Sequence, residues 1–245
     1  MYQKFSSTEE LIRSVRPYLD WLLNWSNNLE ETTLASEIRA LGGQTNRLAI
    51  IIQDMVLAFC CEGTLASERV KAIIDPIVDL LKTADALGVE HFLLSEDRHK
   101  PDALEFRQFG WHAAEGSIES QTVPEIANLP FADKYLVFPK NTLHPALGTG
   151  FERWLDQHPE VTTFIEVGNC TDLCVYQTVM YLKLRGNLLG RDYNIIVPEN
   201  CVDTYNASVE VAAPKGIMPH DANLLHLVFL SHMALNGARV VKRIT

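Results

Sequence analysis

The chain contains 245 residues, of which 47% are hydrophobic, and its formal net charge is −10 at pH 7. A chain of this length and composition can bury one large core, and single α/β domains often reach this size. The net negative charge and the absence of a basic block exclude nucleic acid as an expected partner.

The cysteine pattern and the first residues suggest where the protein works. The number of cysteines, five, is odd, and their spacing matches neither a disulfide framework nor a CxxC zinc site. This pattern indicates a protein of a reducing compartment. The acidic stretch Thr8-Glu9-Glu10 precedes the first apolar segment, so we expect no signal peptide. No apolar run approaches the ~20 residues of a membrane helix. We therefore expect a cytoplasmic protein without a membrane partner.

Residues 1–46 have a helical pattern that differs from the rest of the chain. A first helix can be capped by Ser7 or Thr8, and a second, shorter amphipathic piece follows it. We expect a helical extension packed on the main domain. The alternative is a contact between copies of the chain, because Trp21 and Trp25 would form an exposed apolar face.

From residue 47 onwards, short apolar runs typical of buried strands alternate with helical patterns. The expected strands are 48–52, 91–94, 135–138, 164–167, 194–197 and 239–244, and the expected helices are 67–87, 151–155, 172–185 and 221–235. This alternation predicts an α/β fold, a three-layer α/β/α sandwich with a mainly parallel sheet of about six strands. We therefore divide the chain into an N-terminal helical extension, 1–46, and one domain, 47–245.

The most informative segment is Val-Gly-Asn-Cys-Thr-Asp-Leu-Cys-Val at 167–175, which joins a predicted strand to a predicted helix. We expect a sharp turn and a helix capped by Thr171 or Asp172, which places Cys174 in the first helical turn. The helix N-terminus favours an anion, so we expect this thiol to lose its proton more easily. The free N–H groups of the same turn can hold an oxyanion. The competing interpretation is a buried structural cysteine.

Three chemically distinctive side chains follow three separate predicted strands. Asp54 comes after strand 48–52, Lys140 after 135–138, and Cys174 after 164–167. Ligands of open parallel sheets bind beyond the carboxyl ends of the strands, so these residues converge if their strands are neighbours. A carboxylate beside a thiol can take its proton, and an ammonium stabilises the thiolate. Taken singly, Asp54 reads as a turn residue and Lys140 as a solvated loop lysine.

The loop after the second strand contains a set of side chains suited to a metal. Asp97 and His99 are two residues apart, so in an extended loop both side chains point the same way. With Glu105 and His112 they would supply two oxygens and two nitrogens, which suit zinc, iron(II) or manganese. The alternative is a polar surface loop with a chance histidine pair.

These motifs together make residues 47–245 resemble the isochorismatase-like cysteine hydrolases, and within them the nicotinamidases. In this family an Asp ends the first strand, a Lys follows a middle strand, and a Gly-x-x-Thr-Asp-x-Cys-Val segment carries the nucleophile; here these are Asp54, Lys140 and the segment 168–175. The resemblance implies a cis peptide bond between Asn169 and Cys170. It also implies that the N–H groups of Cys170 and Cys174 face the developing oxyanion.

The resemblance further implies a divalent metal, zinc or alternatively iron or manganese. Its ligands would be Asp97, His99, Glu105 and His112, and it would bind the pyridine nitrogen of the substrate. The sequence departs from the family around this site, because the Pro-Pro and Cys that often flank the last histidine are absent. Two further departures are Val56, where the family often has Gln, and Cys170, where it often has Ala.

Aromatic residues near these motifs are candidates for the substrate pocket. Phe59 matches a family aromatic that stacks on the substrate, and Phe109 or Trp111 would form the opposite wall. All three could equally be ordinary core or loop aromatics.

The resulting functional expectation is a hydrolase that cleaves a small amide, with nicotinamide as the leading substrate, through a cysteine thioester. One alternative keeps this chemistry but acts on a carbamoyl or ureido compound. The other is a non-catalytic binding or assembly protein on the same fold. We also expect a homo-oligomer.

Overall fold

The computed structural model describes residues 5–245, apart from the side chain of Lys215. Its centre is a sheet of seven strands in which every described ladder is parallel. These strands are β2 (Leu48–Gln53), β3 (His91–Asp97), β4 (Tyr135–Lys140), β5 (Thr163–Asn169), β6 (Asn194–Pro198), β7 (Val202–Asp203) and β8 (Arg239–Val241). The order across the sheet is β4-β3-β2-β5-β6-β8, and β7 pairs with the end of β5. The predicted parallel sheet is confirmed, with one strand more than expected.

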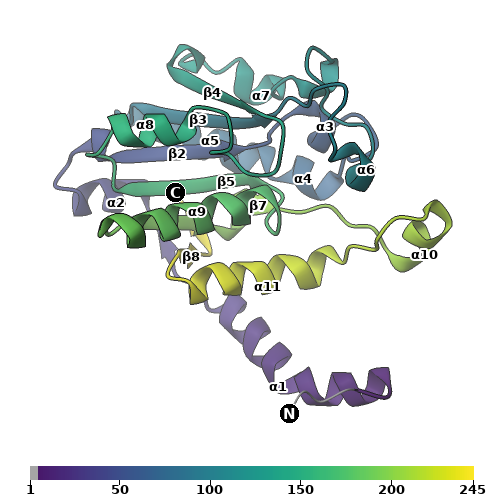
Figure 1. Cartoon of the computed structure of the whole chain (residues 1–245). Helices are drawn as coiled ribbons and strands as arrows, with labels where there is room; N and C mark the ends of the chain where they lie inside the picture. Colours follow the sequence, from purple (N-terminus) through teal and green to yellow (C-terminus); the bar gives the residue numbers. More distant parts are fainter. Residues whose placement is uncertain (1–4) are drawn as a thin grey trace.

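Helices cover both faces of this sheet, as Figure 1 shows. The helices are α1 (Thr8–Asn27), α2 (Leu34–Ala40), α3 (Leu57–Cys60), α4 (Glu68–Ala72), α5 (Ile74–Ala86), α6 (Phe106–Phe109), α7 (Pro124–Ala127), α8 (Phe151–Gln157), α9 (Cys174–Leu189), α10 (Val209–Ala212) and α11 (Ala222–Leu235). Apolar side chains of α2, α4, α5 and α7 form one core layer, and those of α8, α9 and α11 form the other. The predicted three-layer sandwich is therefore the observed architecture.

The two core layers arise from the alternation of side chains along the buried strands. In β2, Leu48, Ile50 and Ile52 join one layer, whereas Ala49 and Ile51 join the other. All six residues of β2 are buried, as expected for a central strand of a parallel sheet covered on both faces. The packed sheet therefore holds in fixed positions the residues that follow the carboxyl ends of its strands.

Two predicted elements are interrupted in the structure. The helix expected over 67–87 is divided into α4 and α5 at Ile73. Pro76 explains the break, because proline cannot donate a backbone hydrogen bond in a helix interior but fits within a first turn. The strand expected over 239–244 ends at Val241, and β9 (Arg243–Ile244) leaves the main sheet to pair with β1 (Glu31–Thr32).

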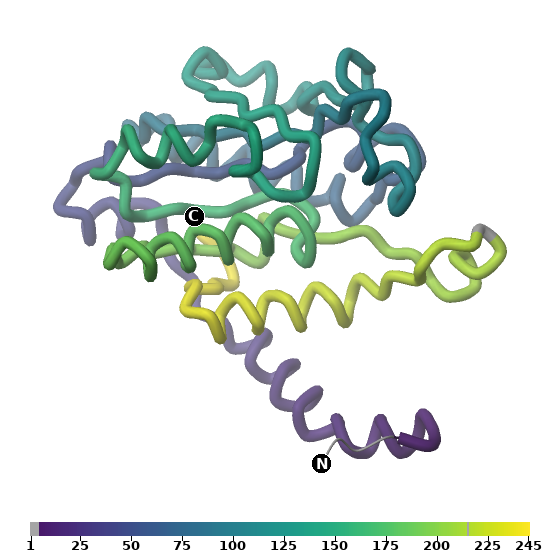
Figure 2. The backbone as a smooth tube through the Cα atoms, viewed as in Figure 1, coloured from purple at the N-terminus to yellow at the C-terminus, as the bar shows by residue number. Residues whose placement is uncertain are grey.

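The N-terminal segment has two parts with different relations to the body. Helix α1 extends away from the sheet and meets α11, where Tyr18 Oη lies 3.1 Å from Ser231 Oγ (Figures 1 and 2). No described residue before Leu22 is buried. By contrast, Leu34 of α2 is fully buried and its N–H donates to the carbonyl of Thr245. Within the described residues, no helix is long and apolar enough to span a bilayer.

Candidate active site

The carboxyl edge of the sheet brings together the three side chains that the sequence singled out. Asp54 follows β2, Lys140 ends β4, and Cys174 begins α9 after β5. Lys140 Nζ lies 2.8 Å from Asp54 Oδ2 and 3.6 Å from Cys174 Sγ. All three residues are buried. Asp54 has a φ of 50°, a left-handed conformation that aspartate tolerates better than most residues.

A fourth side chain, Asp97 at the end of β3, completes the charge arrangement. Lys140 Nζ donates to Asp97 Oδ1, and the Asp97 backbone N–H donates to Asp54 Oδ1 at 2.7 Å. Strand β3 lies between β2 and β4, so it places Asp97 between the other two residues. The site therefore holds two buried carboxyl groups and one buried ammonium.

The two carboxyl groups have opposite pKa shifts. Burial and the charge of Asp97 raise the pKa of Asp54 to about 7, and Lys140 only partly opposes this rise. Burial also acts against the ionised form of Asp97, but Lys140 and His99 outweigh it and lower the pKa of Asp97 to about 2. Asp97 is thus the permanent counter-ion of Lys140, and Asp54 is the carboxyl group able to exchange a proton near neutral pH.

The expectation of an acidified thiol at Cys174 is wrong. Burial raises the pKa of this thiol well above its ordinary value, and the nearby carboxyl groups add to the rise, although Lys140 opposes it. The sulfur therefore rests as a thiol, despite its position at a helix N-terminus. It needs a base to become a nucleophile, and the side chain of Asp54 interacts with it directly.

The loop between β5 and α9 lies close against β2. The Asn169–Cys170 peptide bond is cis. Gly168 has a φ of 111°, and a Cβ atom at this position would lie 2.1 Å from the carbonyl oxygen of Gln53, so no other residue fits. Neither the N–H of Cys170 nor that of Cys174 donates a backbone hydrogen bond to another described residue outside regular helix or strand pairing. Both residues also line the cavity described below.

The predicted helix cap at Thr171 or Asp172 is also wrong. The cap position is Leu173, which makes no side-chain cap hydrogen bond. Thr171 Oγ1 instead lies 2.9 Å from His226 Nδ1, and Asp172 accepts from the hydroxyl of Thr204 at 2.6 Å. Both side chains bind distant elements, which leaves the first turn of α9 uncapped.

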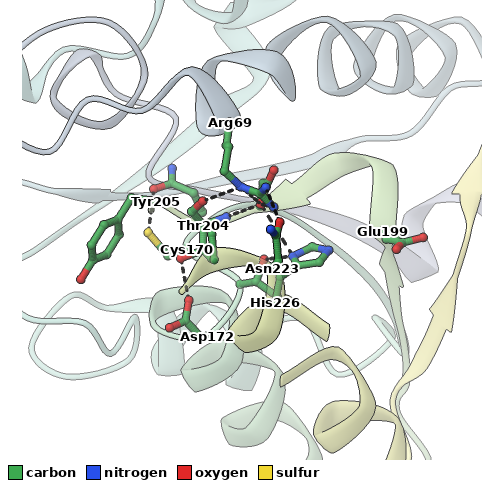
Figure 3. A network of polar contacts seen from close by, with 12 residues as sticks. Arg69, Cys170, Asp172, Glu199, Thr204, Tyr205, Asn223 and His226 are labelled. Atoms are coloured by element: carbon green, nitrogen blue, oxygen red, sulfur yellow. Dashed lines mark hydrogen bonds and ion pairs between the residues drawn. The ribbon is translucent and has the colours of Figure 1, made fainter. Parts of the chain in front are cut away.

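Residues of α4 and α11 belong to a polar network that holds this loop in place (Figure 3). Arg69 of α4 donates to Asp203 Oδ1 and, through its other terminal nitrogen, to Asn223 Oδ1 of α11. Asp203 in turn accepts the backbone N–H of Thr171 through its carbonyl oxygen at 3.1 Å. Segments far apart in the chain therefore fix the position of the loop that carries Cys170 and Cys174.

A cavity with largely apolar walls adjoins these groups, with about 360 Å³ of space unfilled by atoms, including the part open to solvent. It is lined by Asp54, Phe59, Leu65, Asp97, Phe109, His112, Leu143, Asn169, Cys170, Leu173, Cys174 and Tyr205. Phe59 and Phe109 thus occupy the cavity wall. Trp111 does not: its side chain is 54% exposed and packs against Phe106 with ring centroids 4.7 Å apart.

Sequence reasoning missed four cavity residues, Leu65, Leu143, Leu173 and Tyr205. Each lies in a loop outside the described helices and strands, so no periodic pattern marks it. These residues reach the cavity through the tertiary course of their loops.

A second cluster of ligand atoms lies beside the first. One ligand atom each from Asp97, His99 and His112 lies within 4.8 Å of the others, and all three residues are buried. His99 Nε2 is 3.3 Å and His112 Nε2 is 3.8 Å from Asp97 Oδ2. His112 Nδ1 lies 2.8 Å from the carbonyl of Gly110, which fixes the tautomer whose Nε2 carries a free lone pair.

Both ring nitrogens of His99 are buried without a well-aligned hydrogen bond among the described residues, and the contact of Nε2 is with Asp97 Oδ2, another candidate ligand. Unpaired buried nitrogens beside a carboxylate oxygen suit a divalent cation such as zinc. The residues present therefore fit such an ion.

Glu105, the fourth expected ligand, does not belong to this cluster. Its Oε1 accepts the hydroxyl of Thr142 at 2.5 Å and the backbone N–H of Leu143 at 3.1 Å. The carboxylate therefore orders the loop after β4, which contributes Leu143 to the cavity wall. Spacing in the sequence could not distinguish this role from metal binding.

Comparisons with known proteins agree with this architecture. A family model described as the isochorismatase domain matches residues 48–226. Nicotinamidase 1 from Arabidopsis thaliana is 25% identical over 217 residues, which cover 81% of this chain and 86% of that protein.

Solved structures share the fold. A nicotinamidase from Bacillus subtilis has a TM-score of 0.63 at 24% identity, covering 80% of this chain and 99% of that one. An N-carbamoylsarcosine amidase from Thermoplasma acidophilum has a TM-score of 0.60 at 24% identity, covering 80% of this chain and 96% of that one.

Proposed function

This chain belongs to the isochorismatase family of hydrolases, and we propose that it is a cysteine amidohydrolase that converts a small amide to a carboxylate and ammonia. The observation that carries the proposal is one buried ammonium, Lys140 Nζ, 2.8 Å from Asp54 and 3.6 Å from the Cys174 sulfur beside a cavity. A thiol, a carboxyl group with a pKa of about 7 and a fixed cation are the groups that thioester chemistry needs.

In the first half of the reaction, Asp54 takes the thiol proton as Cys174 Sγ forms a bond to the amide carbon. The electron pair of the carbonyl π bond moves to its oxygen, and the N–H groups of Cys170 and Cys174 hold that oxyanion. Asp54 then gives its proton to the nitrogen, the carbon–nitrogen bond breaks, and ammonia leaves a thioester on Cys174.

In the second half, Asp54 takes a proton from a water molecule whose oxygen attacks the thioester carbon. The carbon–sulfur bond breaks, the proton returns to the sulfur, and the carboxylic acid leaves. Lys140 remains charged throughout, because Asp54 and Asp97 more than offset the effect of burial and raise its pKa well above the ordinary value. Its positive charge balances the negative charges of Asp97 and of the transient thiolate.

Nicotinamide is our leading candidate substrate. Phe59 and Phe109 line the cavity, and aromatic side chains stack favourably on a planar ring. We propose that Asp97, His99 and His112 hold a divalent cation, zinc or alternatively iron or manganese, and that His112 brings this site to the cavity wall. When bound, such an ion would supply a Lewis-acid contact to a ring nitrogen.

A carbamoyl or ureido compound is the second candidate substrate. The same thiol, carboxyl group and oxyanion site would cleave its carbon–nitrogen bond, and the structural similarity to an N-carbamoylsarcosine amidase supports keeping it. This substrate would not need a metal to hold a ring. Ammonia release from ureido compounds that is indifferent to a chelator would favour it over nicotinamide.

The test of the proposal is ammonia release from a panel of small amides and ureido compounds, with and without a chelator. We expect Cys174→Ala to abolish release, because it removes the sulfur that Lys140 contacts and that would form the thioester. The matched control is Cys61→Ala, which removes an exposed thiol and leaves release unchanged. Turnover that survives Cys174→Ala would show that the thioester mechanism is wrong.

A further inference from the structure

Two polar side chains lie fully buried in the sheet next to the site without touching the cavity. Gln53 is the last residue of β2 and directly precedes Asp54. Glu166 lies within β5, the neighbouring strand, opposite Ile51 and two residues before Gly168, which faces Gln53. Burying polar groups is costly unless they are hydrogen-bonded, so this pair needs an explanation.

The direction of the hydrogen bonds around Gln53 can be worked out from donor counts. Thr178, one turn after Cys174 in α9, donates its hydroxyl proton to the carbonyl oxygen of Cys174 at 2.9 Å. Its hydroxyl has one proton, so toward Gln53 it can only accept, and Gln53 Nε2 is the donor. This fixes the amide orientation and leaves Gln53 Oε1 as a buried acceptor without a donor among the described residues.

Glu166 is the neighbouring side chain that can donate a hydrogen bond to this acceptor. Both its carboxyl oxygens are buried without a hydrogen-bond partner among the described residues, and its carboxyl group interacts with the side chain of Gln53. Burial raises the pKa of Glu166 well above its ordinary value, so the group is a neutral acid with one proton to donate. The hydrogen bond with Gln53 lowers this pKa but does not offset burial, and Gln53 Oε1 is the unpaired buried acceptor on the side chain with which Glu166 interacts.

We propose that Glu166 is a positioning residue, whose carboxyl group orients Gln53 so that Gln53 and Thr178 brace the end of β2 against the first turn of α9. The brace joins the residue before Asp54 to the carbonyl group of Cys174. It therefore sets the separation of base and nucleophile, in the mechanism on which this inference rests.

This arrangement predicts an effect on the chemical step rather than on substrate binding. Gln53, Glu166 and Thr178 do not line the described cavity, so they make no contact with a bound substrate. A small displacement between a base and its nucleophile reduces the rate while leaving binding intact. We therefore expect changes in kcat at constant KM.

The experiment compares Glu166→Met, which keeps the size but removes the donor, with Glu166→Gln, which keeps a donor. The readouts are kcat and KM on the most rapidly cleaved amide, and the rate of Cys174 alkylation by iodoacetamide followed by mass spectrometry. We expect Glu166→Met to lower kcat and the alkylation rate at least tenfold with KM within twofold. We expect Glu166→Gln to recover most of both rates and to keep the wild-type pH profile.

The opposite end of the brace provides an independent pair, Thr178→Val and Thr178→Ser, which decides the matter if Glu166→Met does not fold. Thr178→Val should lower kcat and the alkylation rate as much as Glu166→Met does, and Thr178→Ser should retain both rates. The double variant Glu166→Met/Thr178→Val should lose no more than either single variant, because both substitutions break the same brace. The control is Thr83→Val, which removes the same type of helix hydrogen bond at the surface of α5 and should change neither rate.

Three results would overturn the brace: folded Thr178→Val with wild-type kcat and alkylation rates, Glu166→Gln as impaired as Glu166→Met, or additive losses in the double variant. A failure of the proposed function would look different. In that case no amide releases ammonia, while the alkylation rates still fall in the order given above.

Discussion

At the scale of single residues, Lys140 is the charge on which the site depends. It is buried between Asp54 and Asp97, and the described structure places no second ammonium or guanidinium in contact with either carboxyl group. One cation therefore compensates two carboxyl groups and lies against the sulfur of Cys174. Its removal should affect stability as well as activity.

We expect Lys140→Met to lower the free energy of unfolding by about 3–5 kcal/mol, because it leaves buried carboxyl groups without their partner. Denaturant titration measures this value. The matched control is Lys134→Met, which breaks a partly exposed pair with Asp85 and should cost less than about 1 kcal/mol. Equal losses in the two variants would contradict the role assigned to Lys140.

Substitution of His112 tests the proposed metal site through metal binding rather than through enzyme activity. His112→Ala removes one of three candidate ligands, so we expect zinc affinity to fall at least about tenfold relative to a wild-type protein that binds roughly one equivalent. Elemental analysis after dialysis against zinc measures the content. His232→Ala, an exposed histidine of α11, is the control. Wild-type protein without bound metal, or unchanged content in His112→Ala, would refute the site.

At the scale of elements, the loop before α9 is positioned by partners that lie 30 to 60 residues further along the chain. His220 is one of them: its Nε2 lies 2.7 Å from Asp172 Oδ2, and its Nδ1 lies 2.8 Å from the carbonyl oxygen of Tyr205. Both neighbours are acceptors, so the doubly protonated imidazolium satisfies both contacts. Tyr205, which lines the cavity, also stacks on the His220 ring.

This arrangement predicts a pH-dependent contribution to stability. Burial opposes the charged form of His220, but the hydrogen bond and charge of Asp172, with smaller effects of the Tyr205 carbonyl group and of Asp221, raise its pKa above the ordinary 6.5. The stabilisation is therefore complete below pH 6.5 and is lost as the pH rises through the raised pKa. We expect His220→Gln to lower the free energy of unfolding more at pH 5.5 than at pH 8.5.

Denaturant titrations at the two pH values measure this difference. His232→Gln on the exposed face of α11 serves as the control and should show no such dependence. A loss in His220→Gln that is the same at both pH values, or larger at pH 8.5, would show that the imidazolium does not stabilise this loop.

Local signals in the sequence were sufficient for most elements but not for their ends. Six predicted strands correspond to described strands, because a buried parallel strand is a continuous apolar run. The breaks at Ile73 and Val241 were missed, although Pro76 was a usable signal for the first. The cap at Thr171 or Asp172 failed because His226 and Thr204, distant in sequence, bind those side chains instead.

At the scale of the whole molecule, helix α1 is the feature without a role in the site. Leu11, Ile12, Tyr18, Trp21 and Leu23 are 42%, 49%, 47%, 51% and 55% exposed, respectively. Tyr18, Trp21 and Trp25 form a stacked series along this helix. These exposed apolar side chains favour the alternative over a helix packed on the main domain, and we propose that this segment mediates contact between copies of the chain.

We expect the full chain to sediment as a species larger than its 27.6 kDa, and the double variant Ile12→Ser/Trp21→Ser to shift toward 27.6 kDa. Neither side chain is buried, so the variant should fold normally. The control is Leu188→Ser on α9, at a side chain that is 84% exposed. A wild-type chain that sediments at 27.6 kDa, or a double variant that sediments like the wild type, would contradict the proposal.

The sequence by itself determined the layered parallel sheet and placed Asp54, Lys140 and Cys174 at its carboxyl edge, because strand periodicity is local and parallel strands end at one edge. Their convergence required the observed strand order, in which β3 and β2 lie between β4 and β5. Only the tertiary structure decided that Lys140 also binds Asp97, that Glu105 leaves the metal cluster and that Trp111 leaves the cavity. Only the tertiary structure showed that Glu166, Gln53 and Thr178 lie together between the end of β2 and Cys174. These features depend on which strands are neighbours and on how loops cross the sheet edge, and residue spacing along the chain carries no record of either.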